Sequence, residues 1–86
     1  MNGNRKRSIH NSRYKAAIDV LVKLRKDQGL SQSDVASEIG LSQSDVSKIE
    51  HCERRLDIIE FLDVLQTVSP NYTDKTLLQV LKNTSL

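Results

Sequence analysis

Apolar residues recur at intervals of three and four along most of the chain, which predicts helices throughout. The first predicted helix covers 12–28 and has Ser12 as its candidate cap. Gly29 followed by Leu30 is typical of a helix end. Arg25 lies on or beside the inward stripe, an unusual place for a charged residue. The helical spacing is carried by Tyr14, Ala17, Ile18, Leu21, Leu24 and Gln28.

The segment 31–50 predicts two short helices joined by a tight turn. Ser31 and Ser42 are cap candidates, and each has an aspartate three residues later, the spacing of a capping box. Gly40 suits the left-handed residue that ends a helix. The second of these helices has a polar face whose side chains suit hydrogen bonding with base edges and phosphates. That face consists of Gln43, Ser44, Ser47 and Lys48.

Two further helices are predicted after this pair. Asp57 and Glu60 have capping-box spacing at the start of a fourth helix, which Pro70 ends. A fifth helix is expected within 73–86, so the chain is predicted to be an all-α, five-helix domain over 12–86. The expected inward face of the fourth helix is formed by Ile58, Phe61, Leu62, Leu65 and Val68.

Several residues between about 17 and 65 resemble the helix-turn-helix of phage-repressor-type regulators, the lambda-repressor-like or Cro/XRE family. The resemblance implies a fold that binds double-stranded DNA, with Gln43 and Ser44 reading bases. It also implies that Gln32 binds a phosphate and braces Gln43, and that Arg25 and Glu50 form a structural ion pair. The residues that carry the resemblance are Gln32, Ala36, Gly40, Leu41, Ser42, Gln43, Val46, Ser47, Ile49 and Glu50.

Cys52 departs from the family pattern, in which glycine is usual at this turn. Either the turn is rearranged, or Cys52 adopts the left-handed conformation at a steric cost of about 1 kcal/mol or more. A reactive thiol beside His51 is a further interpretation, less favoured than a partly buried thiol.

Charge is distributed unevenly, although the net charge is only +2. The predicted helix-turn-helix segment, residues 31–50, is acidic, so we expect flanking segments to neutralise the DNA phosphates. Residues 1–11 are polar and basic, and two interpretations stay open: a solvated tail, or a disordered arm that orders on DNA. Lys48 is expected to contact guanine or a phosphate. The full set of expected phosphate contacts is Gln32, Ser42, Ser47, Arg54, Arg55, Arg5, Lys6 and Arg7.

Composition excludes several classes of function. Eighty-six residues make one domain, and the sequence has neither a membrane-spanning apolar run nor a signal peptide. A single cysteine cannot form an internal disulfide or a multi-thiolate metal site. The serines and carboxylates occupy cap positions, and there is no glycine-rich phosphate loop. No cofactor and no enzymatic activity are expected.

The aliphatic residues of 73–86 outnumber those that one helix face needs, so this segment is expected to contribute to a homodimer. The alternative is that the segment folds over the first helix and completes the core. The expected interface residues are Leu77, Leu78 and Leu81, and Ile59 is also expected outside the core.

These features predict a cytoplasmic transcriptional regulator of bacterial or phage origin. A dimer would read a palindromic operator, as a repressor or autorepressor of phage, mobile-element or restriction–modification type. An antitoxin-type module that binds a partner protein through its C-terminal helix and represses its own promoter is the alternative. A purely protein-binding use of the fold is a third possibility.

Overall fold

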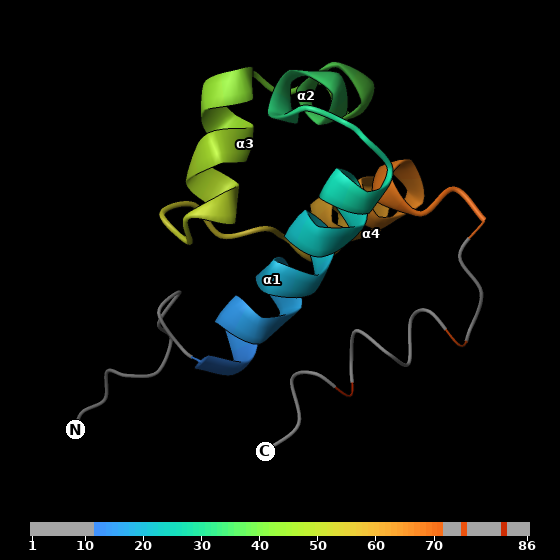
Figure 1. Cartoon of the computed structure of the whole chain (residues 1–86). Coiled ribbons are helices and arrows are strands. Elements are labelled where there is room, and N and C mark those ends of the chain that lie inside the picture. The colour runs from blue at the N-terminus through green and yellow to red at the C-terminus, as the bar shows by residue number, and fades with distance from the viewer. Residues whose placement is uncertain (1–11, 72–74, 76–81, 83–86) are drawn as a thin grey trace.

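The computed structural model describes residues 12–71, 75 and 82. The chain order is α1 (Ser12–Asp27), α2 (Gln32–Ile39), α3 (Gln43–Glu50) and α4 (Ile58–Val68), as Figure 1 shows. The described residues therefore form four helices and no strand, where the sequence predicts five helices. The predicted fifth helix in 73–86 lies almost wholly outside the described residues, and the predicted arm 1–11 lies wholly outside them.

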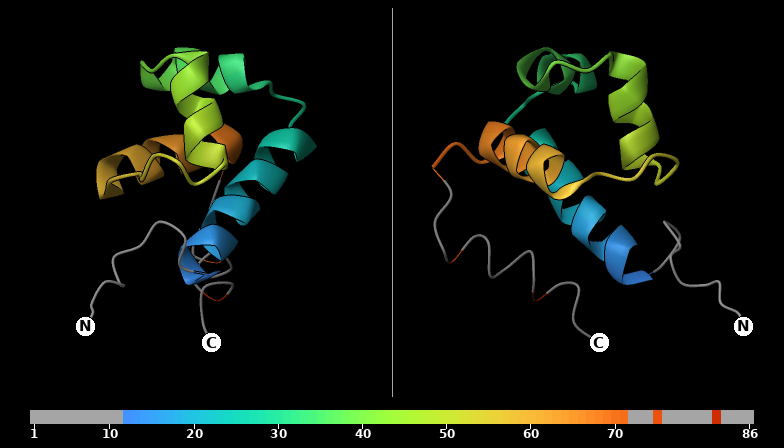
Figure 2. Two further views of the ribbon diagram at one scale, coloured as in Figure 1. Left: turned by 90° about the vertical axis from the view of Figure 1, so that its left-hand side faces the viewer. Right: turned by 180° about the vertical axis from the view of Figure 1, so that it is seen from behind.

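The helices form two levels. In Figures 1 and 2, α2 lies across the top, α3 runs downward from the level of α2, and α1 and α4 cross beneath α2. α2 packs on both α3 and α4, and α1 packs on the same two helices. Short helices such as α2 and α3 have no stable core of their own, so the lower helices provide the surface on which they are held.

The core draws on every helix. Most positions that the helical spacing placed inward are buried or partly buried, including those of α2 and α3. Gln28 and Ile58 are the exceptions, and their expected inward places were wrong. Gln28 is exposed in the turn that follows α1, and the side chain of Ile58 is 68% exposed. The inward stripe of α4 centres on Val64 and Val68, and Ile58 lies at its edge in the first turn. Ile59 is 62% exposed, as expected. The buried hydrophobic residues are Ile18, Leu21, Val35, Ala36, Val46, Ile49, Cys52, Leu56, Val64, Leu65 and Val68.

The ends of α1, α2 and α3 share one backbone design. Each is followed by a residue with positive φ: Gly29 (72°), Gly40 (74°) and Cys52 (59°). After each of these residues the next amide donates back to a carbonyl five residues earlier, as in Leu30 N–H to Arg25 O (3.1 Å). This Schellman arrangement satisfies helix carbonyls that would otherwise lack donors and turns the chain sharply.

Cys52 occupies the left-handed position that glycine occupies after the other two helices. The turn is therefore kept, and Cys52 bears the steric strain of about 1–2 kcal/mol that a Cβ brings there. Its side chain is only 6% exposed and joins the hydrophobic core, which offsets the strain. Burial raises the pKa of the thiol, which disfavours the reactive thiolate.

The starts of α2, α3 and α4 each carry a capping box. Ser31, Ser42 and Asp57 each accept a hydrogen bond from the backbone amide three residues later, at 2.8–3.0 Å. In return the carboxylate at that third residue accepts from the amide of the cap. Defined starts and ends fix where each short helix can lie.

One ion pair joins α1 to α3. Arg25 Nε and Nη2 donate to Glu50 Oε2 (2.6 Å) and Oε1 (2.9 Å), so the contact is bidentate. Arg25 Nη1 also donates to the carbonyl of Leu30 (2.8 Å), in the loop before α2. The two charged side chains are only 10% and 13% exposed, so the pair is largely shielded from water.

We expect Glu50→Met to lower the free energy of unfolding by about 3–5 kcal/mol, because the guanidinium of Arg25 would be left buried without its carboxylate. The double variant Arg25→Met/Glu50→Met should regain most of that loss, because apolar residues can replace a buried pair. Urea denaturation of the three proteins measures both effects. A double variant no more stable than Glu50→Met would contradict a coupled pair.

Candidate nucleic-acid interface

The exposed face of α3 carries the side chains expected to read bases. Gln43, Ser44 and Lys48 are exposed, and Ser47 is partly exposed. Gln43 is the first residue of α3 because Ser42 caps the helix there. The turn at Gly40 sets α3 at an angle to α2, so the first turn of α3 projects from the molecule (Figure 1). A short helix with such an end can enter a major groove.

A chain of hydrogen bonds links the buried ion pair to this face. Glu50 Oε1, which accepts from Arg25, also accepts from Gln32 Nε2 at 2.9 Å. Gln32 Oε1 then accepts from Gln43 Nε2 at 2.7 Å. Four side chains from α1, α2 and α3 are thereby connected, with Arg25 at the buried end and Gln43 at the exposed end. This chain of hydrogen bonds restrains the Gln43 side chain before any ligand is bound, which lowers the conformational entropy that the side chain loses on binding.

Asp45 is an acidic residue close to the reading face, where it would repel phosphates if it pointed outward. Its carboxylate instead accepts from the backbone amide of Ser42 (3.3 Å), while the Ser42 hydroxyl accepts from the amide of Asp45. The backbone amide of Ser42, and after it the Ser42 hydroxyl, favour the charged form of the Asp45 carboxyl group and so lower its pKa. The same arrangement with Ser31 lowers the pKa of Asp34 at the start of α2. Both carboxylates therefore serve as caps.

Arg54, an expected phosphate contact, is held by an acid. Its Nη1 and Nη2 donate to Glu60 Oε1 (3.2 Å) and Oε2 (3.0 Å). The hydrogen bonds from Arg54 are the main cause of the lowered pKa of Glu60, and the amide of Asp57 adds to it. The pair is partly exposed, so Arg54 lies at the surface with its charge balanced by Glu60.

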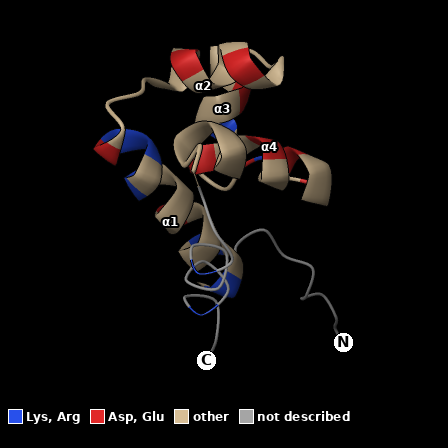
Figure 3. Ribbon diagram, turned by 90° about the vertical axis from the view of Figure 1, so that its right-hand side faces the viewer, with Lys and Arg blue, Asp and Glu red and all other residues tan. Residues whose placement is uncertain are grey.

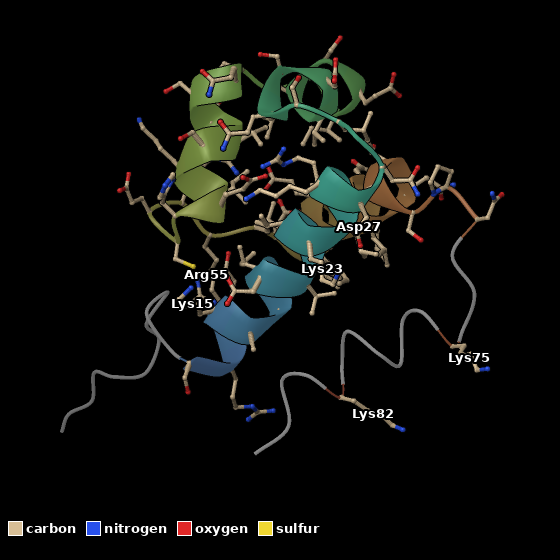
Figure 4. All side chains as sticks on the ribbon, viewed as in Figure 1. Lys15, Lys23, Asp27, Arg55, Lys75 and Lys82 are labelled. Atoms are coloured by element: carbon tan, nitrogen blue, oxygen red, sulfur yellow. The ribbon has the colours of Figure 1, made fainter. Side chains whose placement is uncertain are left out.

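Arg55 lies on the other side of the same loop, against the first turns of α1. Its guanidinium carbon lies 4.9 Å from the centre of the Tyr14 ring, a cation–π distance. Figure 4 shows Arg55 near Lys15 at this end of α1. The Tyr14 hydroxyl accepts from the amide of Leu56 (3.0 Å), which ties the loop to α1. Burial raises the pKa of Tyr14.

Charge is segregated over the helices. α2 carries acidic residues and no basic ones, whereas both ends of α1 are basic (Figure 3). Two lysines of α1 are paired along the helix, Lys15 with Asp19 (3.1 Å) and Lys23 with Asp27 (3.0 Å). These pairs are exposed and contribute little to stability.

Not every predicted site residue is described. Arg5, Lys6 and Arg7, expected to contact phosphates, lie outside the described residues. Leu77, Leu78 and Leu81, expected at a dimer interface, also lie outside them.

Sequence reasoning missed two contacts of the site. The hydrogen bond from Gln32 to Glu50 joins residues 18 apart in the chain, and no local pattern signals it. The pairing of Arg54 with Glu60 was missed because Glu60 was assigned only to its capping box. A basic residue six positions before that glutamate was the available signal.

The part of the chain that the structure describes has neither a metal-binding cluster nor a membrane-spanning helix. No group of three or more His, Cys, Asp or Glu residues is placed there to hold a metal ion. None of its helices is both long enough and apolar enough to cross a membrane.

The sequence was compared with known proteins and protein families. No curated protein matches it. A family model described as helix-turn-helix matches residues 21–67, more than half of the chain. The matched region contains α2, α3 and all of α4 but its last residue, together with the hydrogen-bonded chain from Arg25 to Gln43. The family comprises DNA-binding regulatory domains of the Cro/C1 type, so double-stranded DNA is the implied partner. The chain therefore belongs to the phage-repressor, XRE-like helix-turn-helix family and is a DNA-binding transcription regulator.

Proposed function

We propose that this protein is a repressor that recognises a palindromic operator as a homodimer, acting in the cytoplasm of a bacterium. The observation that carries the proposal is the restrained Gln43 at the exposed start of α3. A glutamine amide can donate to N7 and accept from N6 of the same adenine, which makes a bidentate contact in the major groove. Ser44 reads the neighbouring base in this scheme.

The remaining polar residues position the protein on the phosphates. Lys48 lies one turn further along the exposed face of α3 and contacts guanine or a phosphate. Gln32, Ser42 and Ser47 border the same face and are assigned to phosphate contacts. The loop arginines and the basic segment 1–11 add charge at the flanks: Arg54, Arg55, Arg5, Lys6 and Arg7.

A dimer supports this function because one helix-turn-helix makes few base contacts. Leu77, Leu78 and Leu81 are proposed to form the interface, from the aliphatic excess of their segment. Two-fold symmetry would place half-site centres about 34–36 Å apart, one turn of DNA.

We expect selection from random duplex DNA, at physiological salt, to enrich a palindrome for the purified protein. Gln43→Ala should relax the preference at one position of each half-site, because a bidentate base contact discriminates by about 1–3 kcal/mol. Gln28→Ala is the matched control, since Gln28 is an exposed glutamine in the turn that follows α1. The measurement is the sequence profile of the bound pool.

Each other profile has a definite meaning. Enrichment of a single half-site would support sequence-specific DNA binding but would contradict recognition by a dimer. No enrichment for the unaltered protein would contradict operator recognition, and would favour a purely protein-binding use of the fold.

Glu60→Gln should steepen the dependence of DNA affinity on salt, because it frees Arg54 from its ion pair to neutralise a phosphate. One added contact changes the slope of log K against log [salt] by about 0.9. Asp63→Asn is the control, since it removes the same charge from an exposed position of α4. Equal slopes for the two variants would show that Arg54 makes no additional phosphate contact when Glu60 is replaced. Titrations by fluorescence anisotropy at several salt concentrations give the slopes.

A further inference from the structure

We propose that Glu50 determines base specificity from a distance, because through Gln32 it fixes which end of the Gln43 amide faces the DNA. The orientation that it imposes favours adenine over guanine. This inference rests on the proposed function, in which Gln43 reads a base. It adds a residue that touches no base to those that determine specificity.

The Glu50 carboxylate determines the orientation of the Gln32 amide. A carboxylate has only acceptors, so whatever bonds to Glu50 must donate. Arg25 supplies two donors to the carboxylate, and Gln32 supplies a third. Gln32 can donate only with its amide nitrogen, so its NH₂ must face Glu50.

The orientation of the Gln43 amide follows from that of Gln32. With its nitrogen turned to Glu50, Gln32 offers only its carbonyl oxygen to α3. Gln43 must therefore present its own NH₂ to Gln32, across the 2.7 Å contact. The opposite orientation of Gln43 would bring two carbonyl oxygens together at that distance, which is repulsive. The negative charge of Glu50 thus sets the direction of both glutamine amides.

The outcome is a defined pattern at the exposed end. One N–H of Gln43 is used on Gln32, which leaves the carbonyl oxygen and the second N–H for a base. An outward acceptor beside a donor matches adenine, which offers the N6 donor and the N7 acceptor. Guanine offers two acceptors, O6 and N7, so the outward oxygen of Gln43 would oppose one of them.

The test compares adenine with guanine at the position that Gln43→Ala relaxes. The quantity is the ratio of dissociation constants for the two otherwise identical duplexes. The unaltered protein should favour adenine by roughly 5- to 150-fold, the range of a bidentate contact. Glu50→Gln should bring the ratio close to one, because an amide at position 50 can either donate or accept and no longer fixes Gln32.

Two further variants separate this effect from loss of fold. Gln32→Met cuts the chain of hydrogen bonds while leaving the Arg25–Glu50 pair in place, and should lower the ratio as Glu50→Gln does. The exchange Gln32→Glu/Glu50→Gln puts a carboxylate directly against Gln43, so it should restore the adenine preference even where overall affinity falls. Circular dichroism verifies that each variant is folded.

The outcomes are distinguishable. A ratio lowered by Gln32→Met and restored by the exchange supports the inference. A Gln43-dependent preference that Gln32→Met leaves intact would overturn the inference while the proposed function stands. An unaltered protein without any base preference would overturn the proposed function and the inference with it.

Discussion

The bidentate ion pair between Arg25 and Glu50 is the interaction on which the rest of the structure depends. It joins α1 to α3 where both side chains are nearly buried, and the bond from Arg25 to Leu30 extends it to the loop before α2. A buried pair gains little net stability over apolar residues of the same size. Here the pair instead fixes the orientation of two side-chain amides. The Glu50 carboxylate can only accept hydrogen bonds, so it sets the orientation of Gln32 and, through Gln32, that of Gln43.

The short helices can hold that geometry because their limits are fixed by local chemistry. α2 and α3 have only eight residues each, and each begins with a reciprocal capping box. Each is also followed by a left-handed residue, Gly40 after α2 and Cys52 after α3. At Cys52, the steric strain that the left-handed conformation imposes on the Cβ is offset by burial of the side chain in the core. The result is a rigid frame with one polar face on α3.

Local features were predictable from the sequence, because a cap or a helix end involves residues only three to five apart. The four described helices, the turn at Gly40 and the buried or partly buried state of most predicted core positions follow from such patterns and agree with the structure. Ile58 was placed wrongly because spacing alone does not define the edge of a buried stripe. The link from Gln32 to Glu50 and the pairing of Arg54 with Glu60 depend on how helices and loops pack.

The central claim is that Gln43 is held by this chain of hydrogen bonds before DNA arrives. Nitrogen-15 relaxation of the side-chain amides in the free protein tests it directly. The Gln32 and Gln43 amides should be ordered like rigid backbone, with order parameters of about 0.85, whereas that of the exposed Gln28 amide should fall below about 0.6. A Gln43 amide as mobile as that of Gln28 would contradict the account.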